Sequence, residues 1–168
     1  LDQALHKAIE CQNAGDLKDA ERYYNAILSV DAKHPTANYN KGMLAVRFGK
    51  VAESIPFFKI ALQANASITK YWLSYIDALI KLGRLSDAEM LLDKARNNVG
   101  KGGALDELEK RLSESKYNND DSVVSNILAK AMELRENGKY DEAICYLKDI
   151  TTDFSAEPNA ASIIAHCY

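Results

Sequence analysis

The chain has 168 residues, of which 47% are hydrophobic and 27% charged, and it contains only three prolines. This composition excludes collagen-like and intrinsically disordered chains and favours helices. No apolar run reaches the length of a membrane-spanning helix, because lysines and arginines interrupt each candidate, and we expect no membrane partner.

Charge is distributed unevenly along the chain, although the formal net charge is only −3. Residues 35–102 carry ten Lys and Arg against five Asp and Glu, whereas residues 103–168 carry seven against thirteen. This asymmetry concerns association, and it is too weak to indicate a nucleic-acid partner. The three cysteines form no C-x-x-C pair, which argues against a disulfide framework or a zinc site and favours a reducing, cytoplasmic location.

Helical spacing of apolar residues predicts a first helix within residues 2–13, a turn at Gly15, and a second helix over residues 17–30. The same plan follows twice more, in residues 35–68 and 69–102. Two series keep one constant interval, which we call the repeat period: Gly15, Gly49 and Gly83 at the turns, and Leu17, Val51 and Leu85 after them. The sequence therefore predicts three helix pairs, in residues 1–34, 35–68 and 69–102.

A period of about 34 residues, with a small residue inside the first helix, glycine at the turn and alanine early in the second helix, resembles the tetratricopeptide repeat family. The residues that carry the resemblance are Ala8 and Gly42; the three turn glycines; Ala20 and Ala88; Tyr24, Phe58 and Leu92; Ala61 and Ala95; and Trp72. Ile76 departs from it, because it stands where the first helix usually has a small residue. The resemblance implies an all-α superhelix, an α-solenoid of antiparallel helix pairs.

The period is interrupted after residue 102. Residues 104–115 place Leu105, Leu108 and Leu112 on one face, which predicts an amphipathic helix. This helix either caps the first three repeats or inserts as an extra helix into a continuous stack. The polar run at residues 116–122 predicts a linker, so that residues 103–123 form a spacer.

The pattern resumes after this insertion. It predicts a fourth repeat over residues 124–157, with Gly138 at its turn, and the first helix of a fifth repeat up to Tyr168, within a segment spanning residues 124–168. An open last repeat would allow self-association.

The search for catalytic groups finds no convergent set. His6, His34 and His166 fall in different repeats, and the glycines near residue 102 lack the context of a phosphate-binding loop. We therefore expect no enzyme activity, no cofactor and no metal.

The resemblance implies that first-helix residues line a concave groove. By register these are Tyr39, Asn40, Met43, Val46, Arg47, Lys70, Leu73, Asp77, Ile80 and Lys81. The implied function is a non-catalytic scaffold that binds a partner peptide or helix. Because Arg47, Lys70 and Lys81 surround apolar residues, the partner is expected to have apolar anchors and some acidic character.

Two comparisons within the resemblance refine this expectation. Relatives that clamp a chaperone's terminal carboxylate share Asn40 and Lys70 with this chain, but Leu5, Ile9 and Ser74 differ, and two matches of five argue against that clamp. The order of three repeats, a spacer and a further repeat also resembles the arms that precede glycosyl-, sulfo- or methyltransferase domains in larger bacterial proteins. The alternative function is therefore a substrate-recruiting or oligomerising arm of a transferase whose catalytic domain lies beyond Tyr168.

Overall fold

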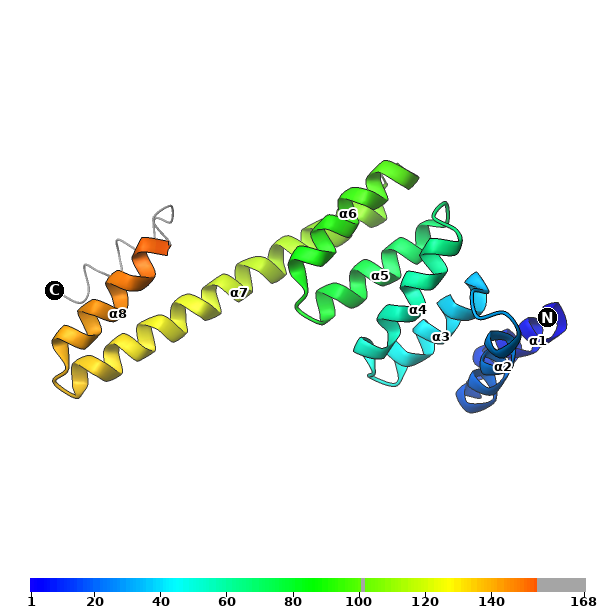
Figure 1. The fold of residues 1–168 in the computed structure, drawn as a ribbon, viewed down its shortest axis with the longest axis horizontal. Coiled ribbons are helices and arrows are strands. Elements are labelled where there is room, and N and C mark those ends of the chain that lie inside the picture. Colours follow the sequence, from blue (N-terminus) through cyan, green and yellow to red (C-terminus); the bar gives the residue numbers. More distant parts are fainter. Residues whose placement is uncertain (101, 154–168) are drawn as a thin grey trace. The chain divides into compact units, whose positions relative to one another are not determined.

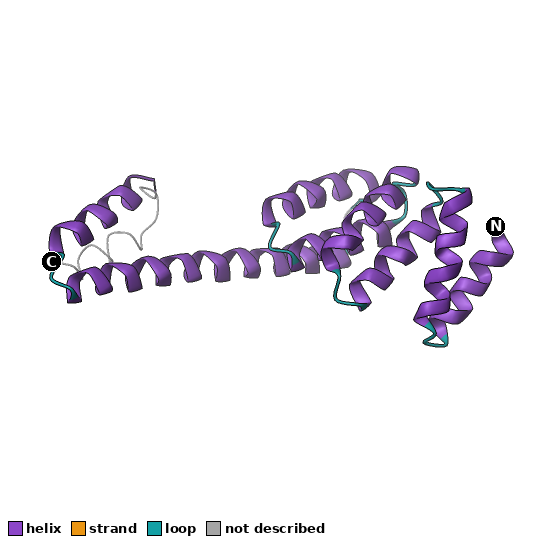
Figure 2. Ribbon diagram, turned by 60° about the horizontal axis from the view of Figure 1, so that its bottom comes forward, coloured by secondary structure: helices purple, strands orange, loops and turns teal. Residues whose placement is uncertain are grey.

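The computed structural model describes residues 1–100 and 102–153. This part of the chain contains eight α-helices and no strand (Figure 1 and Figure 2). The helices are α1 (Asp2–Asn13), α2 (Leu17–Val30), α3 (Pro35–Arg47), α4 (Val51–Ala64), α5 (Thr69–Lys81), α6 (Leu85–Val99), α7 (Gly103–Glu136) and α8 (Tyr140–Asp153). The predicted start of a fifth repeat lies outside the described residues. Two compact units divide the chain, Leu1–Ser115 and Lys116–Tyr168.

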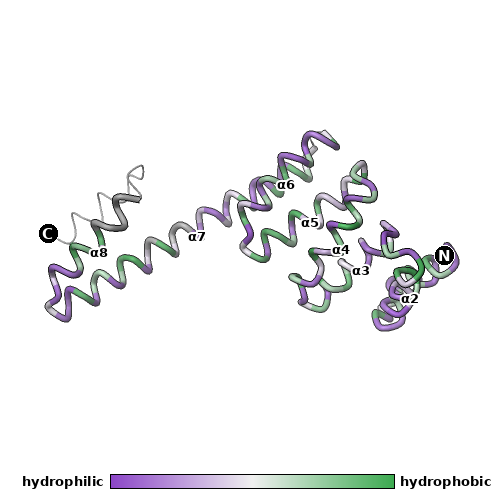
Figure 3. The backbone as a smooth tube through the Cα atoms, viewed as in Figure 1, coloured by the Kyte–Doolittle hydropathy of each residue, from purple (hydrophilic) through white to green (hydrophobic). Residues whose placement is uncertain are grey.

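Helices α1 to α6 of the first unit form three helix pairs, α1 with α2, α3 with α4 and α5 with α6 (Figure 1). Hydrophobic and hydrophilic residues alternate along these helices in Figure 3, as expected when each helix buries one stripe. One cluster of buried side chains joins α1, α2 and α3, and a second joins α4, α5, α6 and the first part of α7. The all-α repeat architecture predicted from the sequence is confirmed.

The turn glycines explain the strict period. Gly15, Gly49 and Gly83 have φ between 69° and 84°, a left-handed conformation that disfavours every residue with a side chain. At the first turn Gly15 N donates to Gln12 O at 3.2 Å, and Asp16 N donates to Cys11 O at 2.9 Å. These two bonds form a Schellman motif, which satisfies the last carbonyls of α1. The other two turns repeat the same bonds, one and two periods later.

A small residue inside the first helix allows the two helices of the first and second pairs to approach closely. A Cβ atom added to Gly42 on α3 would lie 2.7 Å from Cε1 of Phe58 on α4, closer than real Cβ contacts. In the first pair Ala8 and Tyr24 take the equivalent positions, and in the third pair Ile76 and Leu92 do so. A larger residue on one helix thus accompanies a smaller residue on the other, which accounts for Ile76 in a position that usually holds a small residue.

Side chains also fix the loops between repeats. Trp72 Nε1 donates to the carbonyl oxygen of Ala66 at 2.7 Å, and Asn38 Nδ2 donates to that of Ala32 at 3.0 Å. The two donors are one repeat period apart, and so are the two acceptors. Each loop is therefore held by the first helix that follows it.

Helix α7 departs from the sequence prediction. Residues 116–122, which we expected to form a linker, lie within α7, so that prediction is wrong. Tyr117 stands one period after Gly83, and a tyrosine disfavours the left-handed conformation that the turn requires. The helix therefore continues where earlier repeats turn.

The first part of α7 nevertheless keeps the register of a first helix. Leu105 and Leu112 are buried against α5 and α6, one period after the buried Tyr71 and Ala78. The positions that would face a partner helix of its own are exposed and polar. These are Asp106, Lys110 and Ser113, which stand one period after Trp72, Ile76 and Leu79. Residues 103–115 thus pack on the third repeat without a second helix of their own.

The second unit is described from residue 116 to residue 153. The later part of α7 and α8 are joined by a turn at Gly138, whose φ is 72°. Gly138 N donates to Arg135 O, and Lys139 N donates to Leu134 O, at 3.0 Å each, which is the turn geometry of the first unit. Ala131, Ala143 and Leu147 are buried here. The assignment of this helix pair to a fourth repeat stays a prediction.

Candidate functional site

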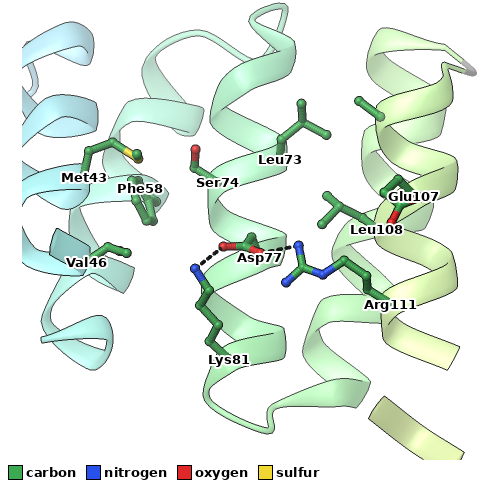
Figure 4. Close-up of a pocket in the computed structure, with 11 residues that line it drawn as sticks. Met43, Val46, Phe58, Leu73, Ser74, Asp77, Lys81, Glu107, Leu108 and Arg111 are labelled. Carbon is green, nitrogen blue, oxygen red and sulfur yellow. Dashed lines mark ion pairs between the residues drawn. The ribbon is translucent and has the colours of Figure 1, made fainter. Parts of the chain in front are cut away.

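The first unit contains a pocket of about 380 Å³ between its first helices. Its lining comes from α3, α5 and the first part of α7, with one residue from α4 (Figure 4). The lining residues are Met43, Val46, Phe58, Leu73, Ser74, Asp77, Lys81, Ala104, Glu107, Leu108 and Arg111. The walls are largely apolar, and the charged groups gather on α5 and α7.

The repeat register explains why α7 lines this pocket. Successive first helices present equivalent positions to the same surface in a repeat stack. The lining residues of α7 each stand one period after a first-helix position of α5. These are Ala104, Glu107, Leu108 and Arg111 after Lys70, Leu73, Ser74 and Asp77. The predicted interruption after residue 102 therefore does not affect the groove-facing positions.

Asp77 is the centre of the polar part of the pocket. Its Oδ2 lies 2.8 Å from Lys81 Nζ, and its Oδ1 lies 2.6 Å from Arg111 Nη1 (Figure 4). Burial alone would raise the pKa of the Asp77 carboxyl, but the hydrogen bonds and charges of Lys81 and Arg111 outweigh burial and lower the pKa below its ordinary value. The carboxylate is thus held ionised, and it joins α5 to α7.

An aromatic group lies next to the pocket. The Tyr39 ring packs 4.9 Å from the ring of Tyr71 and 6.0 Å from that of Phe58, centroid to centroid. The Tyr39 hydroxyl lies 3.2 Å from Ser74 Oγ, and Lys70 Nζ lies 5.0 Å from the centre of the Tyr39 ring. This cation–π contact places a positive charge beside the groove.

The structure brings half of the predicted site residues together in the pocket: Met43, Val46, Leu73, Asp77 and Lys81. Tyr39 and Lys70 lie beside it through the contacts described above. Asn40 is half-buried and Arg47 exposed on α3, and neither lines the pocket. Ile80 is instead part of the core, with 9% exposure, because it follows the fully buried Ile76 by one helical turn.

The sequence prediction missed Phe58 and all four lining residues of α7. Phe58 was assigned to helix packing alone, although its ring also reaches the pocket. The α7 residues could have been found by adding one period to the groove positions of α5. This register is hard to see in the sequence, because Tyr117 stands where the repeat pattern has a turn glycine.

The described residues contain no group of three or more His, Cys, Asp and Glu side chains that could hold a metal ion. Among the helices that the structure describes, none is long and apolar enough to cross a membrane. The pocket offers apolar contact and ion pairs, and such a surface can hold another molecule by burial and charge.

Comparison with solved structures shows the same fold in several proteins. The first tetratricopeptide repeat domain of Spaghetti (RPAP3), bound to the HSP90 peptide SRMEEVD, matches 68% of this chain and 90% of its own, with 18% identity and a TM-score of 0.62. The TPR2B domain of yeast Sti1, in a complex with pHsp70, matches 70% of this chain and 96% of its own, with 16% identity and a TM-score of 0.60.

A tetratricopeptide repeat protein from Parabacteroides merdae matches 98% of this chain and 69% of its own, with 18% identity and a TM-score of 0.64. No curated protein sequence matches this chain. Residues 7–67 match the family model described as tetratricopeptide repeat. Together with the turn geometry and the constant repeat period, this match identifies residues 7–67 as tetratricopeptide repeats, and the solved structures show that the chain shares their fold.

Proposed function

We propose that this chain is a non-catalytic protein-interaction module, which holds a segment of a partner polypeptide in the groove of α3, α5 and the first part of α7. The observation that supports it is the pocket of about 380 Å³, whose apolar walls adjoin a small set of ordered charges. Binding sites for peptide side chains combine these two features, because apolar burial supplies affinity and a few polar groups fix orientation.

The charges around the groove favour acidic residues in the partner. Arg47 and Lys70 are exposed on α3 and α5, and no carboxylate among the side chains that the structure describes pairs with either. Lys81, the third cation of the sequence prediction, is paired with Asp77 instead. Acidic residues of a partner would therefore lie toward Arg47 and Lys70, on both sides of an apolar anchor.

The solved relatives support the class of partner and not its identity. Spaghetti is bound to an HSP90 peptide and the yeast Sti1 domain to pHsp70, at identities of 18% and 16% with this chain. The two shared clamp residues, Asn40 and Lys70, are accompanied here by Ser74 in place of an arginine. A partner peptide of different sequence is the proposal that fits these differences.

Met43→Glu is the variant that tests the groove. A charge placed among the apolar lining residues would remain unpaired or expel the anchor, and we expect at least about a tenfold loss of affinity. Peptides are first selected from a random library on the intact chain, and their affinities for both proteins are then measured by calorimetry.

The matched control is Met90→Glu, because Met90 is 57% exposed on α6 and does not line the pocket. It makes the same change of residue and charge away from the groove. Equal affinities for Met43→Glu, Met90→Glu and the unaltered chain would show that peptides bind elsewhere. A library that yields no binding peptide at all would reject the proposed function.

A further inference from the structure

The charged lining residues of the pocket balance one another. Lys81 and Arg111 contribute two positive charges, and Asp77 and Glu107 contribute two negative ones. Both cations remain reachable, since their side chains are 45% and 39% exposed. The balance depends on Asp77, because its carboxylate lies within 2.8 Å of both cations.

The Asp77 carboxylate already occupies the position beside Lys81 and Arg111 that a carboxylate of the ligand would need. A ligand carboxylate could reach Lys81 and Arg111 only beside the Asp77 carboxylate or in its place, and two carboxylates at such a distance repel each other. A neutral apolar side chain meets no such obstacle, because Met43, Val46, Leu73 and Leu108 offer it a contact surface.

We propose that Asp77 determines the specificity of this groove: it occupies the two cations that a ligand carboxylate would need, so that the pocket accepts a neutral apolar side chain and rejects an acidic one. The inference rests on the proposed function, and it assigns the ligand class of the same site. Acidic residues of the partner belong to the flanks near Arg47 and Lys70, and its anchor in the pocket is a residue such as leucine, methionine or phenylalanine.

The test compares the intact chain with Asp77→Asn in selections from one library of random peptides. The asparagine keeps the shape of the side chain but removes the carboxylate that Lys81 and Arg111 share, so that Glu107 alone opposes these two cations in the pocket. We expect the unaltered chain to select peptides with an apolar anchor, and Asp77→Asn to enrich Asp or Glu at the anchor position. The affinity of Asp77→Asn for those acidic peptides should exceed that of the unaltered chain by about tenfold.

The control is Asp87→Asn, which removes the same charge from another ion pair. Asp87 lies on α6, 2.6 Å from Arg84, and it does not line the pocket. The double variant Asp77→Asn/Arg111→Gln restores neutrality and should lose the preference for acidic anchors. The higher affinity of Asp77→Asn for acidic peptides should also decrease at about 0.5 M salt, because salt screens charges but does not weaken apolar contacts. Circular dichroism checks that each variant is folded.

Three outcomes are decisive. Equal enrichment of acidic anchors by the unaltered chain and by Asp77→Asn would overturn the inference and leave the proposed function standing. Selection of acidic peptides by Asp77→Asn alone, with none by the unaltered chain, would support the masking of the cations and reject the proposed function. Failure of both proteins to select any peptide would reject the proposed function, and the inference with it. The result for the unaltered chain stands even if Asp77→Asn is unfolded, because acidic anchors there contradict the inference directly.

Discussion

Pairs of residues on the two helices of a repeat share the space between them. Gly42 faces Phe58 so closely that no side chain fits, whereas the third repeat has Ile76 and Leu92 in the same two positions. Protein interiors are packed to a nearly constant density, so a change of volume on one helix requires the opposite change on the other. The identity of each residue is therefore set by its partner and not by the repeat pattern alone.

A double-mutant cycle tests this shared volume. Gly42→Ile should overpack the second repeat and lower the free energy of unfolding by about 1–3 kcal/mol, and Phe58→Leu should lower it through a cavity. The double variant copies the third repeat and should cost less than the sum of the two single changes. Urea unfolding of the four proteins measures the coupling, and additive effects would contradict the explanation.

At the scale of elements, the single helix α7 extends over a stretch of chain in which each earlier repeat has two helices. Its first part buries Leu105, Leu108 and Leu112 against the third repeat. Two sets of ion pairs support this contact. Arg96 on α6 lies 2.6 Å from Glu109, and Arg111 lies 2.6 Å from Asp77 on α5. Burial supplies most of the stability, since ion pairs that are partly exposed contribute little each.

Acid should weaken the attachment of α7. The pKa of Asp77 is lower in the folded chain than in the unfolded chain, so its contribution is fully present above the ordinary pKa of a carboxyl and is lost as pH falls through the lowered value. We expect Asp77→Asn to cost about 1 kcal/mol or less near neutral pH, because solvent screens the pairs. The difference from the unaltered chain should begin to shrink as pH falls below about 4 and should close below the lowered pKa of Asp77.

Urea unfolding of both proteins across this pH range provides the measurement, with Asp87→Asn as the control for a general effect of one lost charge. A difference in stability between the unaltered chain and Asp77→Asn that does not change with pH would show that Asp77 does not act through its charge.

At the scale of the whole molecule, the boundary between the two units falls at residue 115, inside α7. The stability of a repeat array is close to a sum of terms within repeats and between neighbours. The first unit should therefore fold without the second, provided that residues 103–115 remain to cover the third repeat.

Two fragments test this division. Residues 1–115 should unfold cooperatively and keep the groove, whereas residues 1–102 should be less stable by several kcal/mol, since each buried leucine contributes about 1.5–3 kcal/mol. Thermal unfolding by circular dichroism and binding of a selected peptide are the two measurements. Equal melting temperatures for the two fragments would contradict the role assigned to residues 103–115.

The sequence was sufficient for the elements whose cause is local. The turn glycines predicted where α1, α3 and α5 end and where α2, α4 and α6 begin, because a left-handed turn requires that residue type. It was not sufficient for α7, because the polar run at residues 116–122 is compatible with either a linker or a solvated helix. In the candidate site, register placed Asp77 in the groove, but only coordinates show that Arg111, one period later, pairs with it.

The turn geometry also limits how such a chain can change in length. The residue after each turn glycine donates its backbone N–H to the preceding helix and is also the N-cap of the next helix. These residues are Asp16, Lys50 and Arg84. An added residue there would break both helix ends at once. Variation in length is therefore confined to the loops between repeats and to the helices themselves, and α7 gains its length by the second of these routes.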